Sequence, residues 1–202
     1  MSGGYPIYLF LEHPEWRAIF GISYLAFFAV GMWAASRERK LPRGENRDRG
    51  SKGVIYLASF AGIAFAALAP RFFAGARLPV PAAPMFAAAI VLFWLGILTY
   101  VWAVVTLGQS FRTSVTLIEG QSLITRGPYR ILRHPAYLGG ILIFAGIGLG
   151  TGNWVALAGT LLLITAGYAF RIRVEERALA ERFGAAFAAH QERTWAVIPL
   201  VW

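Results

Sequence analysis

The chain has 202 residues, 57% of them hydrophobic, and its mean hydropathy is +0.57. These values indicate one integral membrane domain and argue against a soluble fold. The net charge is +9, but the cations flank apolar segments and do not line a polar surface rich in aromatic side chains, which argues against nucleic acid as a partner. The absence of cysteine excludes thiolate sites, and the three histidines lack the spacing of metal ligands.

The first half of the chain contains three apolar segments that we expect to cross the bilayer as helices. They cover Trp16–Ala35, Val54–Ala69 and Ala82–Leu107, and about 20 helical residues span the hydrocarbon core. No cationic region precedes the first segment, so we interpret it as a retained span and not as a signal peptide. The Pro-rich residues 71–84 form the predicted outer connection between the second and third spans.

A basic segment, residues 36–53 (SRERKLPRGENRDRGSKG), separates the first two spans. Its seven lysines and arginines outnumber three acidic residues, which is typical of a cytoplasmic loop. We expect this loop to be a solvated, partly disordered linker that sets the topology and does nothing more.

The second half begins with polar residues 108–134, which carry four arginines and return to the basic side. Two apolar segments follow, Pro135–Gly150 and Trp154–Ile172, and their three-residue joint predicts an antiparallel helical hairpin. Residues Arg173–Arg193 have apolar side chains near helical spacing, so we expect a helix along the cytoplasmic interface. The closing TWAVIPLVW is too short to cross a bilayer and is expected to pack back onto the interface or the bundle.

The chain is therefore predicted to be an all-α integral membrane protein with five transmembrane helices, a C-terminal helical hairpin and an interfacial amphipathic tail helix. Sixteen of the 19 lysines and arginines fall in the loops on one side of this arrangement. The positive-inside rule then places the N-terminus outside and the C-terminus in the cytoplasm. The alanine- and arginine-rich composition is compatible with a bacterial cytoplasmic membrane.

The densest polar stretch is RGPYRILRHPAYLGG, residues Arg126–Gly140. Proline is favoured at the first position of a helix, so we expect a helix to begin at Pro135 with N–H groups suited to an anion. Glycines one turn later would let a ligand or a neighbouring helix approach the backbone. Two tyrosines add stacking faces and hydroxyls: Tyr129 and Tyr137. A plain helix start with topogenic arginines is an equally open interpretation of these residues.

A second polar cluster, RIRVEER, ends the fifth apolar segment. On a helix Arg171 and Glu175 share one face, whereas Glu176 points about 100° away. An exposed, salt-bridged helix would explain this pattern. Alternatively, the hairpin brings the acidic pair beside the helix start at Pro135, across a cleft that suits a zwitterion.

Three motifs together resemble the C-terminal half of the isoprenylcysteine carboxyl methyltransferase family, which is related to membrane phospholipid methyltransferases. They are GPYRILRHPAYLGG, the EER about forty residues later, and RFGAAFAAHQERTWAVIP. The resemblance covers roughly residues 107–199. It implies a membrane enzyme that binds S-adenosylmethionine at the cytosolic ends of the last two spans and methylates a lipophilic acceptor. Residues 1–107 would then hold three spans and the basic loop, and residues 108–202 the cofactor-binding and catalytic half of a single domain, residues 1–202.

The resemblance also implies roles for particular residues. Glu176, together with Glu175, would bind the cofactor's ammonium group, and Arg171 with Glu175 would lie nearest the methyl acceptor. The family usually has tyrosines where this chain has Phe187 and His190, and we expect His190 to be exposed. Motif position assigns five residues to the cofactor pocket: Tyr129, His134, Pro135, Tyr137 and Gly139.

The acceptor divides the possible mechanisms. A carboxylate, as in a prenylcysteine or another hydrophobic acid, is already anionic and would need only orientation by Arg171. An amine, as in a phospholipid N-methyltransferase, must first lose a proton, which makes Glu175 a candidate general base. We favour the carboxylate. Membrane sterol reductases, which use NADPH, share similar HPxY and FG motifs, and a non-catalytic lipid-binding protein is a third class. The sequence leaves the oligomeric state open.

Overall fold

Helices make up most of the structure, a computed structural model that describes residues 9–11, 13–39, 45–113, 116–117 and 122–199. The prediction of an all-helical protein is confirmed in these residues, apart from one pair of two-residue strands. The elements are η1 (Leu9–Leu11), α1 (Pro14–Arg39), β1 (Glu45–Asn46), α2 (Ser51–Phe72), α3 (Ala82–Leu107), η2 (Gly108–Ser110), β2 (Thr116–Leu117), η3 (Gly127–Arg130), α4 (Pro135–Leu149), α5 (Trp154–Phe183) and α6 (Ala185–Gln191).

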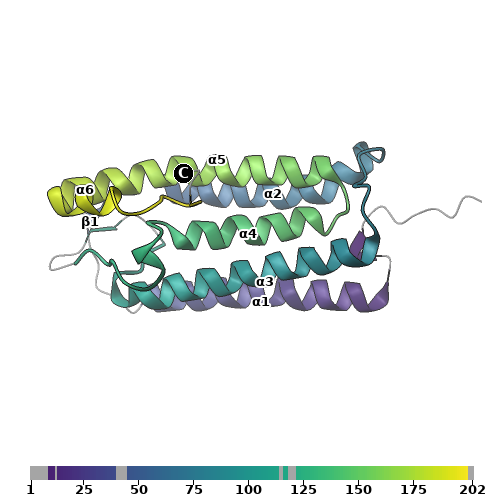
Figure 1. Ribbon diagram of the computed structural model, residues 1–202, viewed down its shortest axis with the longest axis horizontal. Coiled ribbons are helices and arrows are strands. Elements are labelled where there is room, and N and C mark those ends of the chain that lie inside the picture. The colour runs from purple at the N-terminus through teal and green to yellow at the C-terminus, as the bar shows by residue number, and fades with distance from the viewer. Residues whose placement is uncertain (1–8, 12, 40–44, 114–115, 118–121, 200–202) are drawn as a thin grey trace, which may run out of the picture.

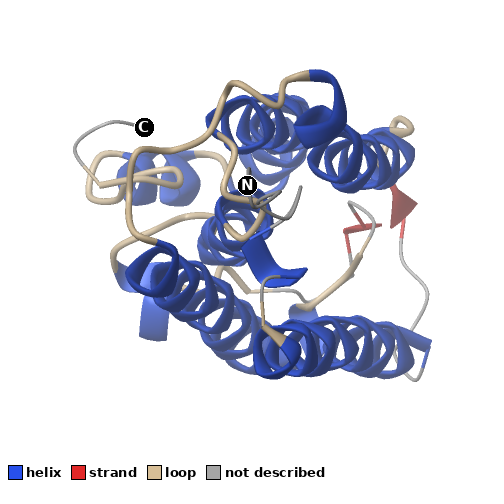
Figure 2. Ribbon diagram, turned by 90° about the vertical axis from the view of Figure 1, so that its right-hand side faces the viewer, coloured by secondary structure: helices blue, strands red, loops and turns tan. Residues whose placement is uncertain are grey.

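Four of these helices are long and apolar enough to cross a membrane: α1, α2, α3 and α5. They run side by side along the longest axis of the molecule (Figure 1), and the view from the hairpin end shows their axes close to the line of sight (Figure 2). The long apolar helices indicate an integral membrane protein. The fifth predicted span corresponds to α4, which has only 15 residues and a length of about 22 Å.

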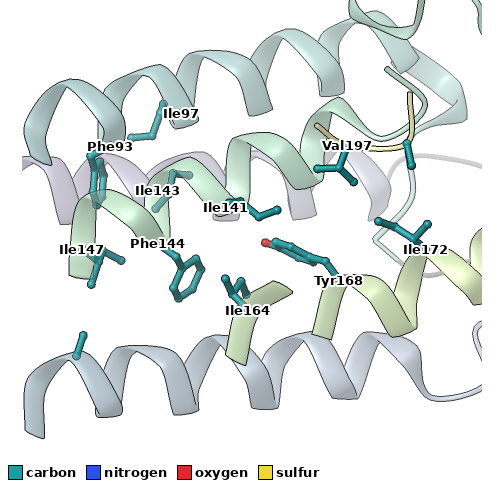
Figure 3. Close-up of a cluster of buried hydrophobic side chains, with 12 residues drawn as sticks. Phe93, Ile97, Ile141, Ile143, Phe144, Ile147, Ile164, Tyr168, Ile172 and Val197 are labelled. Carbon is teal, nitrogen blue, oxygen red and sulfur yellow. The ribbon is translucent and has the colours of Figure 1, made fainter. Parts of the chain in front are cut away.

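Helix α4 lies in the middle of the bundle, between α3 and α5 (Figure 1). Glycines allow the close approach to α3: a Cβ placed on Gly96 would lie 2.5 Å from the carbonyl oxygen of Gly139. The main core cluster is built from all three helices (Figure 3). It includes Phe93 of α3, Phe144 of α4 and Ile164 of α5. The short helix is therefore covered by protein for much of its surface, which fixes the residues at its N-terminal end.

The hairpin predicted between the last two apolar segments is confirmed. Helix α4 ends at Leu149, and α5 begins at Trp154 after an N-cap at Asn153, whose side chain accepts a hydrogen bond from the N–H of Ala156 (3.0 Å). The Asn153 amide also donates to the carbonyl of Phe73 (2.7 Å), which ties the hairpin to the end of α2. Residue 135 is the first residue of α4, as its proline predicted.

The C-terminal region differs from the prediction. Helix α5 continues without interruption to Phe183, so a separate interfacial helix beginning at Arg173 is wrong. No glycine or proline breaks residues 173–183, and the helix ends only at Gly184, which has a positive φ of 50°. After the short helix α6, residues 194–199 pack back onto the bundle as predicted, with Val197 fully buried. Residues 200–202 of the predicted closing segment lie outside the described residues.

The expectation of a merely solvated basic loop is also wrong for its last residues. Strand β1 pairs antiparallel with β2, so the first loop is fastened to the loop that follows α3. Asp48 then turns inward and is only 7% exposed. Two of the predicted topogenic cations, Lys40 and Arg43, lie outside the described residues.

Candidate active site

The polar stretch predicted from the sequence lies where α4 begins. His134 is the N-cap residue and is buried, with 4% of its surface exposed. The N–H groups of Arg133 and His134 donate to the carbonyls of Trp195 and Ala196 (2.8 and 2.9 Å). The C-terminal segment therefore occupies the two backbone donors that immediately precede the first turn of α4.

Glu176 connects three parts of the chain. Its carboxylate accepts hydrogen bonds from Arg133 Nε (2.7 Å) and Gln191 Nε2 (3.3 Å) and lies 3.2 Å from His134 Nε2. Arg133 also donates to the carbonyls of Gln191 and Thr194. Glu176 thus fixes the start of α4 against α5 and α6.

Tyr137 joins the two residues that the sequence placed on one face of α5. Its hydroxyl donates to Glu175 Oε2 (2.6 Å) and accepts from Arg171 Nε (3.1 Å). Its ring stacks on Tyr168, with 4.9 Å between ring centroids. The acidic pair and the helix start do meet, as the hairpin argument predicted. Arg171 and Glu175 are linked through a phenol and not by a direct ion pair.

Arg171 is held by residues from outside the predicted site. Its guanidinium forms a buried ion pair with Asp48 and donates to the hydroxyl of Ser51 (2.7 Å) and the carbonyl of Thr113 (3.0 Å). The Asp48 carboxylate also accepts from the backbone N–H of Lys52 (3.0 Å). Sequence reasoning missed Asp48 because an aspartate among seven cations resembles a solvated loop residue, and only the fold brings it to Arg171.

A cavity of about 850 Å³ opens beside this network. Its polar end is lined by five of the predicted site residues: Tyr129, His134, Tyr137, Arg171 and Glu175. Its apolar part runs between α1 and α2, where Phe27, Ile55 and Phe60 are among the lining side chains. The cavity therefore has a charged end and a longer apolar part, which suits an amphiphilic ligand.

Three predicted cofactor residues lie outside the cavity lining: Pro135, Gly139 and Glu176. Gly139 faces α3, and a Cβ on it would lie 2.8 Å from the carbonyl oxygen of Gly96. Its lack of a side chain is thus used for helix packing. Pro135 is buried at the first position of α4, and Glu176 is occupied with the contacts described above.

Several lining residues were not predicted, and one expectation was wrong. Lys52 in the first turn of α2, and Phe111 and Arg112 just after η2, also line the cavity. His190, expected to be exposed, is half-buried and also lines the cavity. Burial and the nearby Arg133 and His134 lower the pKa of His190.

Tyr129 contributes a protonated phenol to the polar end. It is buried in η3, and burial, followed by the negative charge of Glu175 and the proximity of Tyr100, raises its pKa well above the ordinary value of 10.0. Its hydroxyl therefore stays a potential hydrogen-bond donor at neutral pH.

Comparison with known families places this site in context. The family model described as phospholipid methyltransferase matches residues 84–186, which is half of the chain. The chain belongs to the phospholipid methyltransferase family. The matched region runs from α3 to α6 and contains all of the predicted site residues. Asp48 and Lys52 lie before it.

Individual relatives match half of this chain or less. Protein-S-isoprenylcysteine O-methyltransferase A of Arabidopsis thaliana is 30% identical over 101 residues, which cover 49% of this chain and 51% of that protein. The cobalt-zinc-cadmium resistance protein CzcN of Cupriavidus metallidurans is 36% identical over 81 residues, covering 40% of this chain and 37% of that protein. The chain thus matches about half or less of the length of these two relatives.

The fold is similar to a solved structure of a eukaryotic intramembrane Ras methyltransferase, isoprenylcysteine carboxyl methyltransferase. The TM-score is 0.57 at 22% identity, over 72% of this chain and 52% of that one. The resemblance noted from the sequence motifs is confirmed by these matches. Within the phospholipid methyltransferase family, then, the network of Glu175, Glu176 and Tyr137 lies in the shared half of the chain.

Proposed function

We propose that the protein is an S-adenosylmethionine-dependent methyltransferase that acts on a lipophilic acceptor, a hydrophobic acid such as a prenylcysteine. The observation that carries the proposal is the continuous cavity, which has charged residues at one end and the apolar side chains of α1 and α2 along its length. Family membership and the O-methyltransferase name of the plant relative support an oxygen acceptor.

In this proposal the polar end binds the cofactor. Glu175 lines the cavity, its side chain is 31% exposed, and it receives the cofactor's ammonium group. Tyr129, His134 and Tyr137 form the walls beside it. Glu176 supports them from behind by holding His134 and Arg133. Pro135 and Gly139 set the position of these walls through the start of α4 and its packing on α3.

Methyl transfer from S-adenosylmethionine requires no covalent participation of the protein. S-adenosylmethionine supplies an electrophilic methyl group on a sulfonium, and transfer is an in-line displacement that depends on alignment and on the exclusion of water. A carboxylate acceptor needs no general base. For an amine acceptor, as in phospholipid N-methylation, Glu175 would accept the proton.

The structure changes the role we give to Arg171. A guanidinium has five N–H donors, and Arg171 makes four hydrogen bonds to Tyr137, Asp48, Ser51 and Thr113. Its charge is already compensated by Asp48. Arg171 therefore acts mainly by orienting Tyr137, with at most one donor left for an acceptor.

We further propose that α4 crosses the membrane as a fifth span inside a single membrane domain, residues 1–202. Its length of about 22 Å falls short of the hydrocarbon thickness, but its neighbours cover it on several sides. The distribution of lysine and arginine supports an N-terminus outside and a site and C-terminus in the cytoplasm. Membrane lipids then border α1 and α2, from which the acceptor enters.

Calorimetric titration of the protein in detergent with S-adenosylhomocysteine and with NADPH tests the proposal. We expect the former to bind and Glu175→Gln to weaken it at least about 10-fold, the scale of a lost charge-assisted hydrogen bond. Arg130→Gln is the matched control, since Arg130 is exposed and does not line the cavity. Binding of NADPH alone would favour a reductase, and binding of neither ligand would favour a non-catalytic lipid-binding protein.

A further inference from the structure

Lys52 is a cation of the cavity that forms no ion pair within the described part of the chain. It lies in the first turn of α2, is half-buried, and lines the polar end of the cavity. Its ammonium donates one hydrogen bond, to the hydroxyl of Thr113 (2.7 Å). No carboxylate of the described part of the chain forms an ion pair with it. Because an ammonium has three N–H donors, two of them remain for a ligand.

The neighbouring cations of the site already form ion pairs or hydrogen bonds within the protein. Arg171 is paired with Asp48, and Arg133 with Glu176. The side chain of Arg112 donates to the carbonyls of Gln109 and Phe111. A half-buried cation in a largely apolar cavity attracts an anion more strongly than an exposed one does, because water screens it less.

Thr113 places this ammonium next to the network around Tyr137. The Thr113 hydroxyl accepts from Lys52, and its carbonyl accepts from Arg171, which in turn donates to Tyr137. One residue therefore separates the free cation from the chain of contacts that leads to Glu175. The backbone of Lys52 is fixed as well, since its N–H donates to the Asp48 carboxylate.

We propose that Lys52 binds the carboxylate of the lipophilic acceptor and thereby selects an acid over an uncharged or amine-bearing lipid. The inference rests on the proposed function and assigns its substrate class. Lys52 lies outside the matched residues 84–186, so this selection comes from the half of the chain that the family model does not cover.

In the proposed methyl transfer Lys52 holds the acceptor and forms no covalent bond. One carboxylate oxygen stays on the ammonium, and the other attacks the methyl carbon of the sulfonium. The new C–O bond forms as the C–S bond breaks. The electron pair of the C–S bond remains on the sulfur, which is neutral in the product S-adenosylhomocysteine. The product ester has lost its charge, so its attraction to Lys52 falls and the ester leaves the site more readily.

Equilibrium binding without cofactor tests this inference. The probes are S-farnesylated N-acetylcysteine and its carboxamide, titrated into the detergent-solubilised protein. We expect the parent protein to prefer the acid at least about 10-fold, as a charge-assisted hydrogen bond implies. Lys52→Met should bind both probes equally, and Lys52→Arg should keep the preference. Arg130→Met removes an exposed cation outside the cavity lining and should keep it too.

The outcomes separate this inference from the proposed function. A preference that survives in Lys52→Met, or a parent protein that does not prefer the acid, overturns the role of Lys52. Titration with S-adenosylhomocysteine is the fold check, because Lys52→Met should bind it as the parent does. If no variant binds S-adenosylhomocysteine while the acid preference depends on Lys52, the proposed methyl transfer fails and the acid site stands.

Discussion

The two ends of the helix bundle bury polar side chains in different ways. At the hairpin end the buried polar residues are neutral: the Asn153 side chain bonds to the backbone of Ala156 and Phe73, and the Thr151 hydroxyl donates to the carbonyl of Gly148. At the opposite end the buried groups include the ion pair of Asp48 and Arg171, and the cavity lies beside them.

The comparison indicates that the hairpin end has a structural role and that the cavity end has a role in ligand binding. A neutral side chain that hydrogen-bonds to backbone groups stabilises a turn and leaves no hydrogen-bonding group for a ligand. Buried charges cost free energy to desolvate, and a well-packed apolar replacement is often as stable. Retaining the buried charges of Asp48 and Arg171 at one end is therefore better explained by ligand binding than by stability. The following experiments test this division.

The largest expected effect follows removal of Asp48. The substitution Asp48→Ala leaves the Arg171 guanidinium, 3% exposed, without its counter-charge, which typically costs about 3–5 kcal/mol. Thermal unfolding in detergent measures the loss. Glu181→Ala is the control, because Glu181 pairs with Arg47 in an exposed bridge worth at most about 1 kcal/mol. Equal stability of the two variants would contradict a buried ion pair between Asp48 and Arg171.

Two glycines of α4 separate packing from ligand binding. A Cβ on Gly139 would lie 2.8 Å from the carbonyl oxygen of Gly96, and one on Gly146 would lie 2.6 Å from that of Ala89. Both alanine variants should lose about 1–3 kcal/mol of stability. Only Gly139→Ala should also weaken binding of S-adenosylhomocysteine, because Tyr137 lies two residues away. Gly21→Ala, where the added methyl meets open space and the residue does not line the cavity, controls for both measurements. Equal binding by the two variants would show that the start of α4 does not position the pocket.

Asn153→Ala probes the hairpin end. The variant loses the N-cap of α5 and the hydrogen bond to Phe73, so unfolding should become easier by about 1–2 kcal/mol. Calorimetric affinity for S-adenosylhomocysteine should not change. A loss of affinity comparable to that of Glu175→Gln would mean that the two ends are coupled and would remove the distinction between them.

The smallest effect concerns pH. Burial lowers the pKa of His190 below its ordinary value of 6.5, so the unfolded chain binds more protons in the window just below that value. Stability should therefore fall as the pH drops below 6.5 and level off once the folded histidine is also protonated. Unfolding curves of the parent and of His190→Asn between pH 5 and 8 measure the effect. The assignment would be contradicted if the pH dependence of stability differed between the parent and His190→Asn above pH 7 and not below pH 6.5.

Much of the fold followed from local sequence. The span Ala82–Leu107 was predicted with the bounds that the structure gives, because an uninterrupted apolar segment has few alternatives to a helix in a membrane. Pro135 marked the start of α4, and the short joint at residues 151–153 required a hairpin. The motifs of the second half pointed to the family that the comparisons confirm. These features depend on residues that are close in the chain.

What the sequence could not provide are contacts between distant residues. Asp48 and Arg171 are 123 positions apart, and nothing in a basic loop predicts that one of its aspartates is buried. Gly139 has the same spacing whether it faces a ligand or α3, and only the packing places it against Gly96. The sequence by itself determined the helices, the hairpin and the presence of a charged cluster at one end, because these depend on local hydropathy and helix periodicity. The tertiary structure decided which charges are paired, that Lys52 lines the cavity without an ion pair to the described residues, and where the cavity runs, because those outcomes depend on how separate helices meet.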